Sequence, residues 1–399
     1  MQSGWRVGSV LGIPLYLDRS WFVILLLVTF VYGSNPFWQE SWGALSWGIG
    51  LATALLLFGS VLLHELGHSL VAKSQGIKVN SITLFLFGGI AAIDQESKTP
   101  GQAFQVAIAG PAVSFCLYAL LTLISTLLSV PLILGALLAN VAQINLVLTL
   151  FNLIPGLPLD GGQVLKAAVW KATNSRIKGI RWAARMGQIL GWTAVGVGVL
   201  AYLSTPSLDL IWIVLVGGFA IRNAANYGRV ADLQETLSEL TAADAITRDF
   251  RVLNANMALR QFADEYVLQT SLAPMYFAAS DGRYRGLVTI DDIRNIERSE
   301  WETLTLQSVA RPLATIPSVR ETTPLAEVIL CLENQASPRI VVLTPADAVA
   351  GVIDRGEVVR AIAQKMNLAI SDAVIQRIKD EGEYPSGLKL PALAKTVVE

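Results

Sequence analysis

Six long apolar stretches constrain this chain more than any other feature of its sequence. Each has about the length that a helix needs to cross the hydrocarbon core of a bilayer. With 53% hydrophobic and 15% charged residues, the chain is too apolar for a water-soluble protein and too charged to be wholly embedded. We therefore predict a polytopic α-helical membrane protein with about six transmembrane helices, followed by a soluble part. The stretches lie at residues 20–34, 46–72, 103–129, 132–153, 183–203 and 209–226.

The charged residues divide the chain into two halves. Up to Tyr227 there are 12 Lys and Arg against 7 Asp and Glu, and the remainder has 18 against 24. We expect a membrane domain at 1–227, and the net charge of −1 argues against nucleic acid as a partner. Three alternate connections, 35–45, 130–131 and 204–208, contain no Lys or Arg. The positive-inside rule then predicts that both termini and the C-terminal half are cytoplasmic. The basic residues in the other connections are Arg6, Arg19, Lys73, Lys78, Lys98, Lys166, Lys171, Arg176, Lys178, Arg181 and Arg229.

Two short segments indicate strands rather than spanning helices. Residues 5–19 are punctuated by glycine and partly alternate, which predicts a strand at the membrane surface. Residues 81–93 are too short to cross as a helix and are interrupted by Gly88 and Gly89. We expect a strand or hairpin that dips into the membrane, with an edge that could pair with an extended peptide. An ordinary re-entrant loop is the alternative.

Both histidines of the chain lie in one motif, His64-Glu65-Leu66-Gly67-His68, within the second apolar stretch. Residues i and i+4 share a helix face, so both imidazoles can bind one Zn²⁺ while Glu65 reaches its water. The alternative, two histidines that merely cap or pack, does not account for ionisable residues inside a spanning helix. His64 is nine residues from Lys73, which predicts a depth of about 13 Å from the cytoplasmic face.

The third metal ligand must be acidic, because a catalytic zinc usually has three protein ligands and no third histidine exists. Asp160 remains after the acids at span ends and in connections are set aside. Pro155 and Pro158 break the helix before it and turn it away from lipid. The alternative is that Asp160 is the N-cap of the helix that starts near Gly161.

The motif HELGH followed by Asn152-Leu-Ile-Pro155-Gly-Leu-Pro158-Leu-Asp160-Gly161 resembles the site-2 protease family of intramembrane zinc metalloproteases. Gly12-Ile-Pro-Leu and Phe87-Gly-Gly-Ile90 also resemble the family pattern, so the similarity covers roughly residues 5–226. The resemblance implies that His64, His68 and Asp160 bind one catalytic zinc and that Glu65 is the catalytic base. It also implies that Asn152 positions the substrate or stabilises the oxyanion. Gln143 and Asn145 match no motif, and we interpret them as helix-packing groups.

The C-terminal half contains a repeat with a period near 65 residues, Gly286-Leu-Val-Thr-Ile-Asp-Asp292 and Gly351-Val-Ile-Asp-Arg-Gly-Glu357. Each copy predicts a strand end, a turn and a helix start. The pair resembles tandem CBS domains at 240–300 and 305–366, which implies an α/β module that binds an adenosine nucleotide through Thr289 and Asp292. Helix capping is the alternative role for these two residues.

The second copy has Asp354 and Glu357 in the corresponding places, and this acidic pair would repel phosphate. Residues 367–399 form a C-terminal tail with one short predicted helix, and the sequence does not indicate its role.

The resemblance implies an intramembrane protease that cleaves peptide bonds within or near transmembrane segments of membrane-anchored proteins, in a prokaryotic cell membrane. Its expected partners are a transmembrane protein substrate, the lipid bilayer and, through the CBS module, a nucleotide and a second copy of the chain. A transporter or channel gated by CBS domains is one alternative, although the spans show no internal repeat. A non-catalytic binder of membrane proteins is another, although none of His64, Glu65, His68 and Asp160 is missing.

Overall fold

The computed structural model describes residues 4–86, 88–128, 131–267, 275–334, 338–385 and 387–398. The chain divides into two compact units, Met1–Ala231 and Asp232–Glu399, which are described separately. Phe87, part of one family-like segment, lies outside the described residues.

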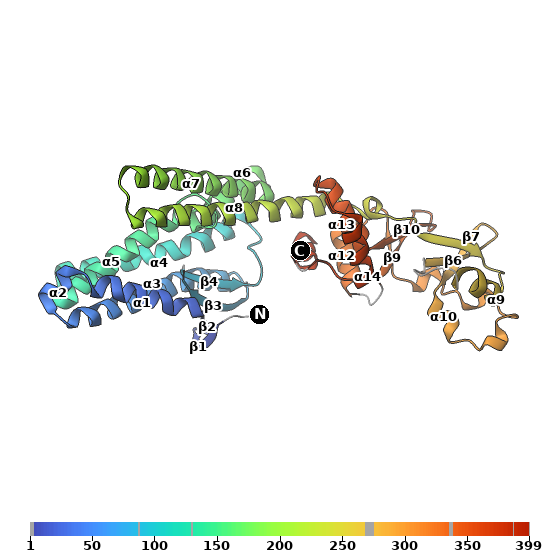
Figure 1. Ribbon diagram of the computed structural model, residues 1–399, viewed down its shortest axis with the longest axis horizontal. Helices are drawn as coiled ribbons and strands as arrows, with labels where there is room; N and C mark the ends of the chain where they lie inside the picture. Colours follow the sequence, from blue (N-terminus) through green and yellow to red (C-terminus); the bar gives the residue numbers. More distant parts are fainter. Residues whose placement is uncertain are drawn as a thin grey trace. The chain divides into compact units, whose positions relative to one another are not determined.

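The first unit consists mainly of long helices, with a small sheet near its N-terminus (Figure 1). Helix α3 packs against α1 and α4, and α4 in turn packs against α5 and α6. Helix α3 therefore lies in the interior of the helical layer, which suits a helix that carries polar site residues. The elements are β1 (Trp5–Val10), β2 (Ile13–Leu17), α1 (Arg19–Gly33), α2 (Pro36–Trp42), α3 (Leu45–Ser74), β3 (Val79–Phe85), β4 (Gly88–Ile93), α4 (Pro100–Leu127), α5 (Leu132–Asn152), α6 (Asp160–Thr173), α7 (Arg176–Ser204) and α8 (Leu208–Glu239).

Five of these helices are long and apolar enough to cross a membrane, counted over the described residues. They are α3, α4, α5, α7 and α8, and they correspond to five of the six predicted spans. The sixth predicted span is α1, which has 15 residues. At 1.5 Å per residue it is about 22 Å long, shorter than the roughly 30 Å hydrocarbon core. The chain is thus a multi-pass α-helical membrane protein.

The four strands of the first unit form one sheet in the order β1-β2-β3-β4. β1 and β2 form an antiparallel hairpin, β2 pairs in parallel with β3, and β3 pairs antiparallel with β4. The sheet buries Ile13, Ile82 and Leu84 against Phe58 and Val61 of α3. Strand structure is confirmed in both segments: residues 5–19 contain the hairpin of β1 and β2, and residues 81–93 contain most of the hairpin of β3 and β4, with β4 at the edge of the sheet.

The second unit contains two three-stranded sheets with the same pairing, one parallel and one antiparallel contact in each. β5 and β6 are parallel and β6 and β7 antiparallel, and β8, β9 and β10 repeat this arrangement. The predicted repeat is therefore visible as repeated strand topology. The elements from β5 are β5 (Phe250–Asn254), α9 (Leu259–Phe262), β6 (Met275–Ser280), β7 (Arg283–Val288), α10 (Ile290–Arg294), α11 (Leu306–Val309), β8 (Ser318–Arg320), α12 (Leu325–Asn334), β9 (Arg339–Leu343), β10 (Val349–Asp354), α13 (Arg355–Lys365), α14 (Asp372–Glu381) and α15 (Leu390–Val398), with short single turns at Ala242–Ala245, Ala263–Val267, Arg298–Glu300 and Leu313–Thr315.

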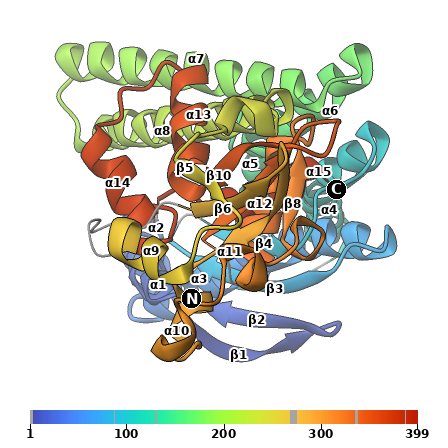
Figure 2. The ribbon, with the colours of Figure 1, turned by 90° about the vertical axis from the view of Figure 1, so that its right-hand side faces the viewer.

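The tail from residue 367 is more ordered than the sequence predicted, because it forms the two helices α14 and α15. Figure 2 shows α14 beside α13, and α15 packs against α12. Ile375, Ile378 and Leu390 of these helices are buried in the core of the unit. The sequence predicted one short helix where the structure has two, because the apolar faces of these helices are short and are separated by Pro and Gly.

Candidate metal centre

The two histidines lie where the helical spacing predicts, on one face of α3 at the centre of the membrane unit. His64 and His68 are 3% and 8% exposed, so the surrounding helices exclude lipid from both rings. Their Nε2 atoms are 3.3 Å apart and point at the same space. Gly67, between them, lies so close to α4 that a Cβ there would be 2.9 Å from the carbonyl oxygen of Ala109.

Asp160 lies next to the two histidine rings and comes from a different element of the chain. It is the first residue of α6, after a turn at Leu153–Leu159. Its Oδ2 atom lies 3.0 Å from Nε2 of His64 and 3.4 Å from Nε2 of His68. The N-cap of α6 is Leu159 and no side chain caps this helix, so the alternative role of Asp160 as an N-cap is ruled out.

The donor set fits a tetrahedral zinc ion. Zinc binds nitrogen and carboxylate oxygen at about 2.0–2.2 Å, so two ligands of a tetrahedral site lie about 3.3–3.5 Å apart. The three distances among His64 Nε2, His68 Nε2 and Asp160 Oδ2 are 3.0, 3.3 and 3.4 Å. These atoms could hold one metal ion and leave the fourth position to water or substrate.

Helix α4 fixes the orientation of both imidazole rings. Nδ1 of His68 donates to the carbonyl oxygen of Val106 at 2.7 Å, and Nδ1 of His64 lies 2.9 Å from Oγ of the buried Ser114. A proton held on Nδ1 leaves Nε2 free as a metal ligand. Between these contacts, Gly110 lets the backbone of α4 pass next to the two Nε2 atoms.

Glu65 lies beside the histidines and faces the edge strand β4. A Cβ at Gly89 would come within 2.4 Å of the Glu65 side chain, so a larger residue here would displace that side chain. A cavity of about 880 Å³ opens here, lined by His64, Glu65, Asp160 and Asn152 together with parts of β4, α7 and α8. The predicted base and the predicted positioning residue therefore line the same space.

The two polar groups of α5 that match no motif behave differently. Asn145 is buried and donates to Oγ of Ser60 at 2.8 Å, which confirms its helix-packing role. Gln143 is exposed on the surface of α5, so its interpretation as a helix-packing group was wrong.

In the second unit, Thr289 and Asp292 lie together at the start of α10. Thr289 is the N-cap, and Oδ2 of Asp292 accepts hydrogen bonds from the backbone N–H and the hydroxyl of Thr289 at 2.8 and 2.7 Å. Nε of Arg311 lies 3.3 Å from the same carboxylate oxygen. Helix capping is thus present, and it is accompanied by a guanidinium group that the sequence did not indicate.

The corresponding acidic pair of the second copy is buried and neutralised. Asp354 is the N-cap of α13, and Glu357 is 6% exposed. Nζ of Lys379, from α14, lies 2.6 Å from Oε1 of Glu357 and 3.6 Å from Oδ2 of Asp354. Arg360 adds a contact of 2.8 Å to Glu357. The ammonium group of Lys379, from the tail, therefore neutralises the acidic pair that the sequence predicted would repel phosphate.

An HExxH helix that spans the membrane and a facing Asp on a second element together define a membrane-embedded metalloprotease. The family model described as peptidase family M50 matches residues 52–138 and 129–193. A Synechocystis protein, provisionally named as a zinc metalloprotease, is 42% identical over 91% of this chain and 96% of its own length. A zinc metalloprotease of Methanocaldococcus jannaschii is 27% identical over 90% of this chain and 96% of its own length. The chain belongs to peptidase family M50, the family of the site-2 proteases.

Solved structures match each half of the chain. The site-2 protease from Methanocaldococcus jannaschii is 30% identical and covers 56% of this chain and 95% of its own, with a TM-score of 0.42. The structure of CBSX2 in complex with AMP is 19% identical and covers 32% of this chain and 98% of its own, with a TM-score of 0.26.

Proposed function

We propose that this chain is an intramembrane zinc endopeptidase that hydrolyses peptide bonds within or near the transmembrane segments of membrane-anchored proteins. The observation that carries the proposal is the convergence of three metal-ligating atoms within 4.8 Å of one another, next to Glu65, with both histidines on α3, a helix long and apolar enough to span the membrane. Ionisable groups at such a depth are retained for function.

In this proposal His64, His68 and Asp160 hold the metal ion. A bound Zn²⁺ supplies a Lewis acid that makes a water more acidic and polarises the carbonyl group of the substrate. Glu65 takes the proton from that water and returns it to the nitrogen of the leaving amine, so it acts first as a base and then as an acid. Asn152, which lines the same cavity, orients the carbonyl group with its side-chain amide.

The edge of β4 is the proposed binding element for the substrate backbone. A transmembrane helix hides its amide groups in internal hydrogen bonds, so it must unwind before a peptide bond can be attacked. β4 is the edge strand of its sheet within the described residues, and it runs past Glu65. Pairing with this edge would hold the unwound segment extended beside the metal ligands.

The test of the proteolytic function is a comparison of metal content and cleavage. Purified full-length protein is mixed with a single-span test substrate, and zinc per chain is measured alongside. We expect Glu65→Gln to retain zinc and to lose turnover by about 10²–10⁴-fold, the range that general acid–base groups contribute. Glu40→Gln, an exposed acid of α2, is the matched control and should behave as wild type. Unchanged turnover in Glu65→Gln would refute the proposed mechanism.

We also propose that the second unit binds one adenosine nucleotide per chain and thereby regulates cleavage. Thr289, Asp292 and Arg311 offer a hydroxyl, a carboxylate for a ribose and a guanidinium for phosphate at one place. The second position is filled by Lys379 on Glu357, which argues for a single site. The nucleotide changes proteolysis only if it binds more tightly to one state of the protease, and a peptide at the metal must then change nucleotide affinity by the same factor.

Calorimetric titration with AMP and ATP tests this regulation, with cleavage measured in parallel. We expect a stoichiometry of one and a change in cleavage rate, both lost in Asp292→Ala while zinc content stays at one per chain. Asp291→Ala, an exposed neighbour in the same turn, is the control. Binding without a change in cleavage would leave the module as a structural or dimerising element.

A further inference from the structure

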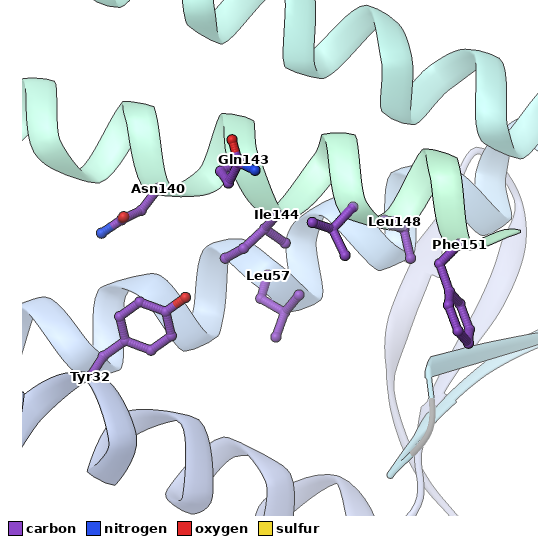
Figure 3. Close-up of a pocket in the computed structure, with 8 residues that line it drawn as sticks. Tyr32, Leu57, Asn140, Gln143, Ile144, Leu148 and Phe151 are labelled. Atoms are coloured by element: carbon purple, nitrogen blue, oxygen red, sulfur yellow. The ribbon is translucent and has the colours of Figure 1, made fainter. Parts of the chain in front are cut away.

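A second hollow lies in the membrane unit, separate from the metal ligands. It is a groove of about 420 Å³ between α1, α3 and α5 (Figure 3). Figure 3 shows Tyr32 from α1 and Leu57 from α3 facing the residues of α5 that complete it, among them Asn140, Gln143, Leu148 and Phe151. The groove therefore combines an apolar floor with two carboxamides and one phenol.

Polar groups at this place need a partner that the described residues do not supply. Gln143 lies near the middle of α5, an otherwise apolar spanning helix, and is exposed. Nδ2 of Asn140, whose side chain lines the groove, is buried and has no hydrogen-bond partner among the described residues. Lipid tails can neither donate nor accept hydrogen bonds, so hydrocarbon in the groove would leave both carboxamides unpaired.

The groove adjoins the cavity at the metal ligands. Leu148 and Phe151 line both spaces, so the two hollows lie next to each other along α5. Along α5, Gln143 precedes Asn152 by nine residues, which is about 13 Å. A segment that passes the metal ligands and continues toward the N-terminal end of α5 would therefore reach Gln143.

We propose that this groove binds the transmembrane helix of the substrate beyond the cleaved bond, and that Asn140 and Gln143 select a polar side chain on it. The inference rests on the proposed protease function, whose substrate it specifies. The 13 Å separation corresponds to about nine residues of helix or four residues of extended chain. The recognised side chain thus lies between about four and nine residues from the cleaved bond.

The kinetic test uses single-span substrates with an all-leucine segment in which one Asn is moved from three to twelve residues from the cleaved bond. With wild-type full-length protein we expect KM to be lowest when the Asn lies four to nine residues away. Interhelical hydrogen bonds in membranes are individually weak, so the expected gain is about five- to ten-fold for two bonds. The double variant Asn140→Leu/Gln143→Leu should lose this preference and keep kcat.

Two controls separate this proposal from the protease function itself. Thr193→Val removes an exposed polar group of α7 outside the groove and should keep the preference. A short peptide that covers only two residues on each side of the cleaved bond ends before the groove and should be cleaved equally by wild type and by the double variant. A wild-type protein that cleaves the substrates with no dependence on the Asn position overturns the proposed groove and leaves the protease function standing.

Photocrosslinking tests occupancy without requiring cleavage. A benzophenone amino acid replaces Ile144, which lines the groove, in the Glu65→Gln background. We expect crosslinks to substrate residues four to nine positions from the bond, and their loss on adding Asn140→Leu and Gln143→Leu. Crosslinks to lipid alone, or to a second copy of the chain in place of substrate, would overturn the proposal.

Discussion

A single methyl group at Gly110 should remove the metal from this protein. A Cβ built at Gly110 would lie 2.2 Å from Nε2 of His68 and 2.6 Å from Nε2 of His64. Zinc–nitrogen bonds are about 2.0–2.1 Å long, so the methyl carbon of Gly110→Ala would compete for the space in which the ion must sit. The same substitution favours the helix by about 1 kcal/mol, because alanine is a better helix former than glycine. We therefore expect loss of metal without loss of fold.

The size of the effect follows from how tightly the rings are held. Real Cβ atoms essentially never come closer than 3.0 Å to another heavy atom, so the His68 ring must retreat by about 0.8 Å and the His64 ring by about 0.4 Å. Both rings are buried and tied to α4 through Val106 and Ser114. Loss of one such supporting contact typically lowers metal affinity 10–100-fold. Displacement of both ligands should exceed about 100-fold.

The assay is zinc content per chain together with cleavage of a single-span substrate and thermal unfolding of the full-length protein. Gly101→Ala is the matched control, because Gly101 lies in the same helix and a Cβ there has no heavy atom within 4 Å. We expect zinc and turnover to fall together in Gly110→Ala and to stay at wild-type levels in the control. One zinc per chain and normal turnover in Gly110→Ala would refute the geometry described for the site.

Three further predictions test the surroundings of the site. Ser114→Ala should weaken zinc binding by about 10-fold, because the His64 ring loses its Nδ1 partner; unchanged affinity in a chelator competition would contradict this. Burial alone would raise the pKa of Glu96, but Lys166 of α6 and Arg176 of α7 contact its carboxylate and lower the pKa overall. The ionised carboxylate therefore stabilises the fold at neutral pH, and this stabilisation is lost as the pH falls through the lowered pKa. Glu96→Gln should therefore lower the Tm at pH 7, with a difference that vanishes in acid, and a difference that grows in acid would reverse the sign argument. In a cysteine-free background, a cysteine at Lys78 should be shielded from an impermeant reagent in intact cells and one at Glu40 should react; the opposite pattern would invert the topology.

The three residues that meet at the candidate metal centre could be predicted from the sequence because so few residues were eligible. The chain has two histidines, and their spacing of four residues is informative on a helix. Asp160 was identified as the third candidate ligand by elimination among the seven acidic residues of the membrane half. Its position after two prolines also indicated a break in the helix. The structure brings these three residues together. The alternative for Asp160, capping, failed because its side chain points at the histidines and away from the start of α6.

Helix lengths and the C-terminal tail were less accessible to sequence reasoning. The first apolar stretch gives a helix of only 15 residues, although its composition matches that of the true spans. In the tail, α14 and α15 each bury one narrow apolar face on a core formed by distant residues. Such short apolar faces contain too few periodic positions for the sequence pattern to distinguish a helix from a polar loop.

The contacts that orient the two imidazole rings could not be predicted from the sequence, because they come from α4, whose sequence is that of an ordinary apolar span. Val106 and Ser114 of α4 lie 38 and 50 residues from their histidine partners. No periodic sequence pattern predicts that a given carbonyl group or hydroxyl will hydrogen-bond a histidine. Yet α3 alone does not determine which nitrogen of either ring is free. The partners on α4 do so, and Gly110 provides the space between them. The HExxH motif thus supplies the donor atoms, whereas α4 determines that both Nε2 atoms point at Asp160, so substitutions in α4 should impair metal binding as severely as substitutions near the motif itself.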